Sequence, residues 1–338
     1  MRTRLLVASE ANTQLVWQIP TSQAQLLLQT TLLPLLLSLV VCVAASFTFP
    51  TRLVLQSPGG LFLENLASST LHMVDPTGPT PTFDEVHTFP NVTALLGIAE
   101  VKPDVYGIIA LVLNDTTITA IPGTVTIWRV DLSSGGPPMV NKAADVPDGM
   151  FLDGLSAVPG EPELVLGADT AAGRIWQINL RTGVVRIAAQ DDAFAPDAPA
   201  PAFGINGLHV RGGNLYFTNS QKKTFSRFPI SLRGGNVAQA GPIEVLRSAN
   251  GTDQFDDFAF DSAGRVWAAT LPDTLTVFFP PVRGNSMLGQ LNALGNPVEF
   301  NRPTSAMFGR GGVAQQHTLY VTTQAGQLIA VDTTGIRG

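Results

Sequence analysis

The sequence contains little cysteine, little charge and few aromatic residues. Its 338 residues include one cysteine, 14% charged side chains and 7% aromatic side chains. The single Cys42 excludes a framework of disulfides and a metal site built from several cysteines. Twenty lysines and arginines stand against 26 aspartates and glutamates, with no basic run, so a nucleic-acid-binding protein is not expected.

Apolar residues, glycine and proline are abundant instead. The hydrophobic fraction is 45%, with 32 glycines and 25 prolines. This apolar content is too high for a disordered chain, and the absence of Gly triplets and charged heptads excludes collagen and coiled coil. No P-loop, Rossmann fingerprint or G-x-S-x-G motif is present, so no nucleotide cofactor is expected.

The first 45 residues are predicted to be a leader. Residues 31–45 read TLLPLLLSLVVCVAA, an apolar run that is short for a membrane span and ends in small residues. Val43 and Ala45 suit cleavage before Ser46, although the start is longer than usual, and a signal anchor is the alternative. Cleavage would leave 46–338 as one domain in the secretory pathway or outside the cell, without Cys42 and without a stable membrane span.

Three N-glycosylation sequons agree with export. The acceptors would be Asn91, Asn114 and Asn250, each followed two residues later by threonine. Because such triplets also occur by chance, they support secretion without establishing it.

Five similar segments begin at Gly97, Gly154, Gly207, Phe258 and Ser305. Each segment reads as a short apolar strand, a turn with glycine or proline, an alternating strand, a second turn and a third strand. Their spacing of roughly 50 residues, without helical periodicity, predicts the blades of a β-propeller.

A sixth opening at Glu64 is shorter than the others. About a dozen residues are missing between Ala67 and Ser68 when this segment is aligned with the rest. The extended segment Phe47–Gln56 is the natural strand to pair with the last blade and cover its edge. The expected fold is therefore an all-β six-bladed β-propeller with an incomplete first blade, the ring being closed by an N-terminal strand.

The blade openings resemble the SMP-30/gluconolactonase/LRE-like family of six-bladed propellers, also called calcium-dependent phosphotriesterase-like. The resemblance covers about 47–332 and is closest to a secreted fungal branch. The segments that carry it are FLENLA at 62–67, LLGIAEVKPDVYGIIA at 95–110, INGLHVRGGNLYFTNS at 205–220 and FDDFAFDSAGRVWAAT at 255–270.

The resemblance implies one divalent cation on the propeller axis, held by Glu64, Asn206 and Asp256. Carboxylate and amide oxygens suit Ca²⁺ or Mg²⁺, with Ca²⁺ favoured, and waters and substrate would complete the shell. Such a metal could polarise a carbonyl, with Asp256 as general base. Taken singly, Glu64 could equally be a surface acid, Asn206-Gly207 a hairpin turn, and Asp256-Asp257 the start of a strand.

The third opening departs from the family's hydrolases. Their Asn-Asp-Gly is here Leu152-Asp153-Gly154, which keeps Asp153 as a second catalytic candidate and favours a more apolar ligand. Phe151, Phe203 and Phe258 lie at or near such openings and are predicted, with Leu152, to contact substrate; packing between blades is the alternative. The four histidines show no ligand spacing, and His209 is interpreted as packed between blades.

Three functions remain open. The fungal branch includes hetero-Diels–Alderases of tropolone-sesquiterpenoid biosynthesis, which implies dehydration of a hydroxymethyl precursor to a quinone methide and its coupling to a terpene alkene. The alternatives are a calcium-dependent lactonase or esterase and a propeller that binds a ligand without chemistry. The expected partner is a small apolar molecule, and the protein is expected to be a monomer.

Overall fold

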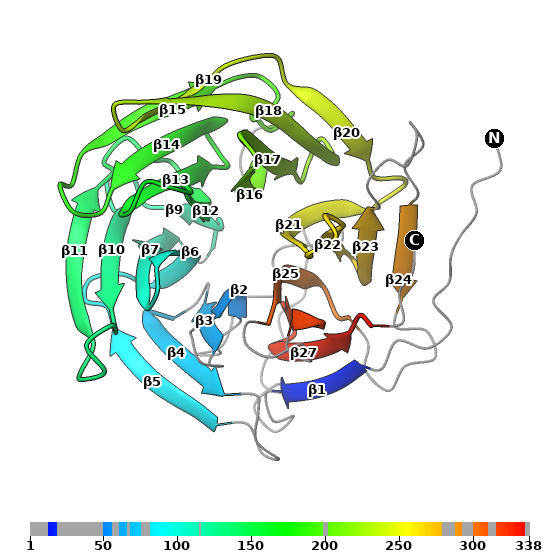
Figure 1. Ribbon diagram of the computed structural model, residues 1–338, viewed down its shortest axis with the longest axis horizontal. Coiled ribbons are helices and arrows are strands. Elements are labelled where there is room, and N and C mark those ends of the chain that lie inside the picture. The colour runs from blue at the N-terminus through cyan, green and yellow to red at the C-terminus, as the bar shows by residue number, and fades with distance from the viewer. Residues whose placement is uncertain are drawn as a thin grey trace.

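The computed structural model is an all-β propeller whose sheets surround a central axis (Figure 1). It describes residues 13–18, 50–55, 61–65, 68–75, 82–114, 116–198, 202–278, 288–292, 300–309 and 316–334. These residues form six antiparallel sheets of four or five strands and one two-stranded ribbon. None of their helical turns is long and apolar enough to cross a membrane.

Each sheet is built mainly from consecutive strands. The first contains β2 (Pro50–Leu55), β3 (Leu61–Asn65), β4 (Thr70–Asp75) and β5 (Thr82–Thr88). The second contains β6 (Ala94–Lys102), β7 (Val105–Leu111), β10 (Thr126–Asp131) and β11 (Met139–Asp145), with the ribbon β8 (Leu113–Asn114) and β9 (Thr119–Ala120) between β7 and β10 in the chain. The third contains β12 (Leu152–Ala157), β13 (Leu164–Asp169), β14 (Arg174–Asn179) and β15 (Val185–Gln190).

The remaining three sheets complete the circle. The fourth contains β16 (Ile205–Arg211), β17 (Asn214–Asn219), β18 (Thr224–Arg233), β19 (Asn236–Gln239) and β20 (Glu244–Ser248). The fifth contains β21 (Gln254–Phe260), β22 (Val266–Leu271), β23 (Thr274–Phe278) and β24 (Leu288–Asn292). The sixth contains β25 (Pro303–Phe308), β26 (Thr318–Thr323), β27 (Gln327–Asp332) and β1 (Thr13–Gln18).

In each sheet, the strand named first in the two preceding paragraphs lies nearest the propeller axis (Figure 1). These innermost strands contact one another in the order β2, β6, β12, β16, β21 and β25, and β25 returns to β2. The ring is therefore closed at its centre by contacts between neighbouring sheets. The prediction of a β-propeller is confirmed.

The strand that covers the outer edge of the last sheet is not the predicted one. Phe47–Gln56 was expected there, but its residues Pro50–Leu55 form β2, which pairs with β3 as the innermost strand of the first sheet. The strand paired with β27 is β1, Thr13–Gln18. The expectation was wrong because the first blade was aligned on Glu64, which lies on the second strand β3, so that Pro50–Leu55 was left over as a separate closing strand.

The predicted gap in the first blade is absent for the same reason. The first sheet has four strands, and its opening is β2, one strand earlier than the sequence alignment placed it. Glu64 consequently lies near the end of β3, the second strand, where Asn65 pairs with Pro50. The incomplete first blade was an error of alignment.

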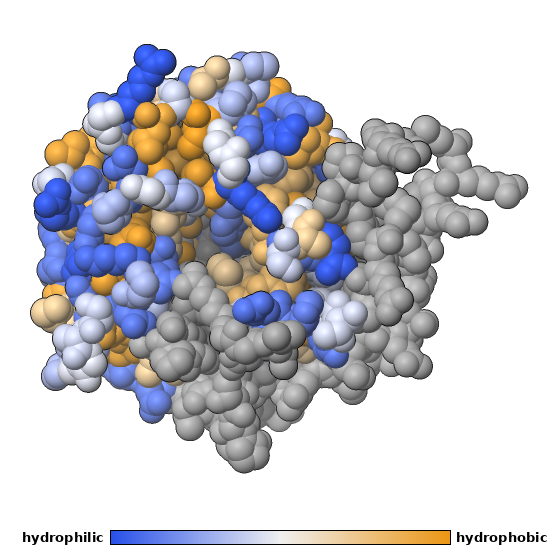
Figure 2. Space-filling view, in the orientation of Figure 1, coloured by the Kyte–Doolittle hydropathy of each residue, from blue (hydrophilic) through white to orange (hydrophobic). Residues whose placement is uncertain are grey.

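The hydrophobic core lies between the faces of neighbouring sheets. One cluster joins the second and third sheets through residues such as Ile109, Leu155 and Trp176, and another joins the third and fourth through Leu166 and Phe217. Because each buried face is shared by two sheets, no sheet is stable without its neighbours. Figure 2 shows hydrophobic and hydrophilic residues interspersed on one face of the ring.

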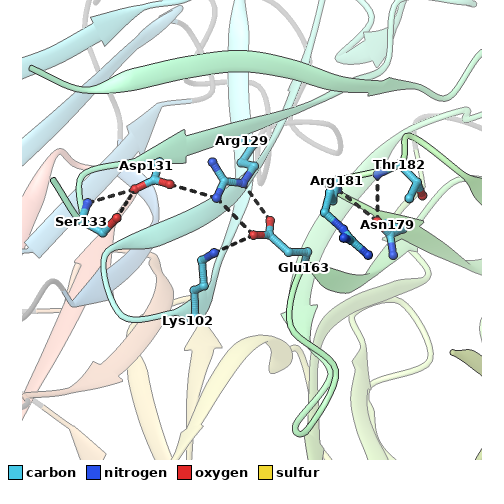
Figure 3. Close-up of polar contacts among 8 residues, drawn as sticks. All are labelled: Lys102, Arg129, Asp131, Ser133, Glu163, Asn179, Arg181 and Thr182. Carbon is cyan, nitrogen blue, oxygen red and sulfur yellow. Dashed lines mark hydrogen bonds and ion pairs between the residues drawn. The ribbon is translucent and has the colours of Figure 1, made fainter.

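A partly buried ion-pair cluster also joins the second and third sheets (Figure 3). Arg129 Nε on β10 donates to Glu163 Oε2 at 2.7 Å, Lys102 Nζ lies 2.9 Å from Glu163 Oε1, and Arg129 Nη2 donates to Asp131 Oδ2 at 2.9 Å. Glu163 immediately precedes β13 and is almost completely buried. The hydrogen bond from Arg129 lowers the pKa of the Glu163 carboxyl below its ordinary value of 4.5, and Lys102 adds to the effect.

This cluster predicts a loss of stability in acid. Because the folded-state pKa of Glu163 lies below the unfolded-state value, its contribution is fully present above about pH 4.5 and disappears as the pH falls through the folded-state pKa. We expect the urea-unfolding free energy of Glu163→Gln to fall less than that of the wild type between pH 6 and pH 3. Parallel pH profiles for the two proteins would contradict the expectation.

Candidate functional site

The innermost strands carry a β-bulge near their start, where the predicted site residues lie. In β12, β16 and β21, two residues of the inner strand oppose one residue of the second strand. The bulged pairs are Asp153-Gly154, Asn206-Gly207 and Asp256-Asp257. A bulge redirects side chains at the edge of a sheet, which suits a site at the centre of the ring.

Glycine at these bulges lets adjacent innermost strands approach closely. A Cβ on Gly154 would lie 2.2 Å from the Asn206 carbonyl oxygen, and a Cβ on Gly207 would lie 2.3 Å from Asp257 Oδ1. Since no side chain fits, the bulges of the third, fourth and fifth sheets are directly adjacent. Asp153, Asn206 and Asp256 therefore occupy equivalent positions on consecutive strands around the axis.

Side chains of the fourth sheet fix this arrangement. The buried Asn206 donates through Nδ2 to Ser220 Oγ at 3.0 Å, and Ser220 Oγ donates to the Phe255 carbonyl at 2.8 Å. Thr218 Oγ1 accepts from Gly207 N at 2.9 Å and donates to the Asp256 carbonyl at 2.5 Å. The backbone of β21 is thereby held against β16, whereas the Asp256 and Asp153 side chains remain half-buried.

The described residues do not by themselves form the predicted metal centre. They bring Asn206 and Asp256 onto adjacent strands, but the Glu64 side chain lies outside the described part of the structure. Within that part, no three His, Cys, Asp or Glu side chains lie close enough to hold a metal ion. The Ca²⁺ site therefore stays a prediction.

The predicted apolar contacts lie mostly in the core. Leu152 and Phe258 have no exposed surface, and Phe151 is nearly as buried. Phe203 is partly exposed and packs edge-on against Phe151, with ring centroids 5.4 Å apart. Of these four predicted substrate contacts, only Phe203 presents appreciable surface to a ligand, and a direct contact at Leu152 or Phe258 would require rearrangement.

Asp257 was not predicted as a site residue. It occupies the bulge position at which Gly154 and Gly207 stand, is 4% exposed, and contacts His209 and Ser305 on the neighbouring innermost strands. The signal in the sequence was an aspartate at a position where other openings have glycine. Without the register of the strands, Asp256-Asp257 read as an ordinary polar strand start.

Two curated relatives share most of the chain. "Putative hetero-Diels-Alderase" of Phoma sp. is 26% identical over 323 residues, which span 83% of this chain and 88% of the relative. "Putative hetero-Diels-Alderase asR5" of Sarocladium schorii is 25% identical, over 86% of each chain. No protein-family model matches the sequence.

Solved structures show the same fold. The calcium-binding protein regucalcin of Agrobacterium tumefaciens aligns with a TM-score of 0.55 and 16% identity, over 85% of this chain and 92% of its own. At this identity the likeness concerns the fold alone. The chain is thus similar to proteins named as hetero-Diels–Alderases in sequence and to regucalcin-type propellers in fold, as the resemblance of its blade openings predicted.

Proposed function

We propose that this propeller is an enzyme of the hetero-Diels–Alderase kind. The observation that carries the proposal is its similarity, over most of the chain, to two proteins of that name. The reaction would remove water from a hydroxymethyl phenol or tropolone: the ring hydroxyl loses its proton and the hydroxymethyl carbon loses hydroxide. The resulting quinone methide then forms one C–C and one C–O bond with a terpene alkene.

The site supplies groups suited to this chemistry. Asp256 and Asp153 are half-buried carboxyls at the innermost strands; one of them would protonate the hydroxyl that leaves as water and regain the proton that the ring hydroxyl releases. Binding both reactants at the axis would supply proximity and exclude water, which otherwise captures the quinone methide. We further propose that the six sheets are the six blades of a single monomeric ring.

The direct test supplies a synthetic hydroxymethyl precursor and a terpene alkene to the purified protein. We expect a cycloadduct to form with fixed stereochemistry, and we expect Asp256→Asn to lower its rate by about 100-fold, the scale of general acid–base catalysis. Asp145→Asn, on the exposed outer strand β11, is the control and should keep the wild-type rate. A racemic product formed at the background rate would refute the proposal.

A calcium-dependent lactonase is the second candidate, favoured by the propeller shared with calcium-binding regucalcin. It predicts that γ-lactones are hydrolysed, that a chelator abolishes the hydrolysis, and that metal analysis finds one cation per chain. Cycloaddition that survives the chelator, without lactone turnover, favours the first candidate. A folded protein with neither activity would favour a ligand-binding propeller.

Secretion is also a proposal. Asn91 and Asn250 are exposed, whereas Asn114 is partly buried and its Oδ1 accepts from the backbone N–H groups of Thr116 and Thr117. We therefore expect glycans at Asn91 and Asn250 and little at Asn114 when the chain is expressed in a secreting fungus. Intact mass before and after deglycosylation measures this, and an unmodified protein retained in cells would contradict it.

The same preparation tests leader removal. Strand β1 lies within residues 1–45, so cleavage before Ser46 would leave the sixth sheet with β25, β26 and β27. An N-terminal sequence beginning at Ser46 would support the leader. A mature protein that retains Thr13–Gln18 would exclude it and support β1 as the outer strand.

A further inference from the structure

Three polar side chains from consecutive innermost strands meet beside the predicted site. His209 lies on β16, Asp257 on β21 and Ser305 on β25. Asp257 Oδ1 lies 3.3 Å from His209 Nε2, and Ser305 Oγ donates to Asp257 Oδ2 at 3.1 Å. One carboxylate thus connects the fourth, fifth and sixth sheets at the inner edge of the ring.

The carboxylate is held in place by its surroundings. Asp257 is 4% exposed, and a buried carboxylate is costly unless its oxygens accept hydrogen bonds. Gly207 leaves the space that the Asp257 carboxylate occupies, because a Cβ at that position would lie 2.3 Å from Oδ1. Asp257 therefore fits only because its neighbour on β16 is glycine.

Asp257 in turn fixes the orientation of the His209 ring. A carboxylate only accepts hydrogen bonds, so a neutral His209 satisfies this contact with its proton on Nε2 and its lone pair on Nδ1. The ring also packs edge-on against Phe258, with centroids 4.7 Å apart. About 25% of the His209 side chain stays exposed, so part of the imidazole is accessible to a ligand.

We propose that His209 binds ligand by accepting a hydrogen bond from the ring hydroxyl of a hydroxymethyl phenol, with Asp257 and Ser305 as positioning residues. The ligand class rests on the proposed function, whereas the orientation of the imidazole rests on the contacts alone. An exposed hydrogen-bond acceptor of fixed orientation suits a small molecule that carries one hydroxyl donor.

The binding test compares two probes that differ by that hydroxyl. 2-Hydroxybenzyl alcohol has a ring hydroxyl, and 2-methylbenzyl alcohol has a methyl group in its place. The variant His209→Phe keeps a flat ring against Phe258 and removes both nitrogens. By calorimetric titration of the full chain, we expect it to weaken binding of the hydroxyl probe about 10-fold, the effect of one hydrogen bond, and to leave binding of the methyl probe within twofold.

His87→Phe is the matched control. His87 lies on the outer strand β5, far from the propeller axis, and packs edge-on against Phe89 with ring centroids 4.8 Å apart. The substitution is therefore chemically the same as His209→Phe but remote from the proposed binding site. It should leave both affinities unchanged. Equal weakening of both probes by His209→Phe would show a packing role and overturn the proposal, as would failure of the wild type to bind the hydroxyl probe.

The positioning role has its own readout. In ¹⁵N-histidine spectra of the full chain, His209 should show the Nε2–H form in the wild type and less of it in Asp257→Asn, with a smaller change in Ser305→Ala. An Nδ1–H form in the wild type would overturn the proposal. Binding that depends on His209, without any cycloaddition, would support this inference while refuting the proposed function.

Discussion

Gly154→Ala is expected to destabilise the protein by more than about 3 kcal/mol or to prevent folding. The new Cβ would lie 2.2 Å from the Asn206 carbonyl oxygen and 2.8 Å from Leu208 Cδ2. Real Cβ atoms do not approach backbone this closely, so β12 and β16 must separate where the innermost strands meet. Overpacking of this kind commonly costs 1–3 kcal/mol, and a clash with backbone, which has no alternative rotamer, is at the upper end or beyond.

The measurement is the urea midpoint of Gly154→Ala against that of Gly136→Ala. Gly136 is a suitable control because a Cβ there meets its nearest neighbour at 3.6 Å and its backbone does not require glycine. The control should stay within about 0.5 kcal/mol of the wild type. If the two variants were equally stable, the close approach of the innermost strands would be wrong.

Asp169→Ala is expected to cost about 3–5 kcal/mol. Asp169 is fully buried at the end of β13 and accepts hydrogen bonds from several groups. The donors are Met150 N at 3.1 Å, Phe151 N at 3.0 Å, Ala172 N at 3.3 Å, Arg174 Nε at 3.2 Å and Trp176 Nε1 at 3.1 Å. Removing the carboxylate leaves several donors without their acceptor and takes away the negative charge that pairs with Arg174, which costs far more than the net value of a hydrogen bond.

This prediction also concerns the site, because two of the donors precede β12. Loss of Asp169 should loosen the segment that leads to Leu152 and Asp153. Asp145→Ala is the control: that carboxylate pairs with Lys142 on the exposed outer strand, and its removal should cost no more than about 1 kcal/mol. Thermal unfolding followed by circular dichroism distinguishes the two, and a small effect at Asp169 would contradict the assigned network.

Sequence repeats were sufficient to predict a propeller because each blade repeats the same order of strands and turns. They located the openings at Gly97, Gly154 and Gly207 correctly, since glycine is required there by contact with the next innermost strand. They failed at the first blade, where β2 was not recognised as the opening strand. Alignment on Glu64 therefore began one strand late, and both the missing strand and the ring-closing role of Phe47–Gln56 followed from that error.

The site shows the same division. The sequence alone determined where five of the six sheets begin, and so placed Asn206 and Asp256 on innermost strands. Only the tertiary structure decided that Leu152 and Phe258 lie in the core and that Asp257 joins His209 to Ser305. The reason is physical. A repeat of about 50 residues predicts the order of the strands. Which residues of neighbouring sheets touch depends on the direction in which each β-bulge points its side chains.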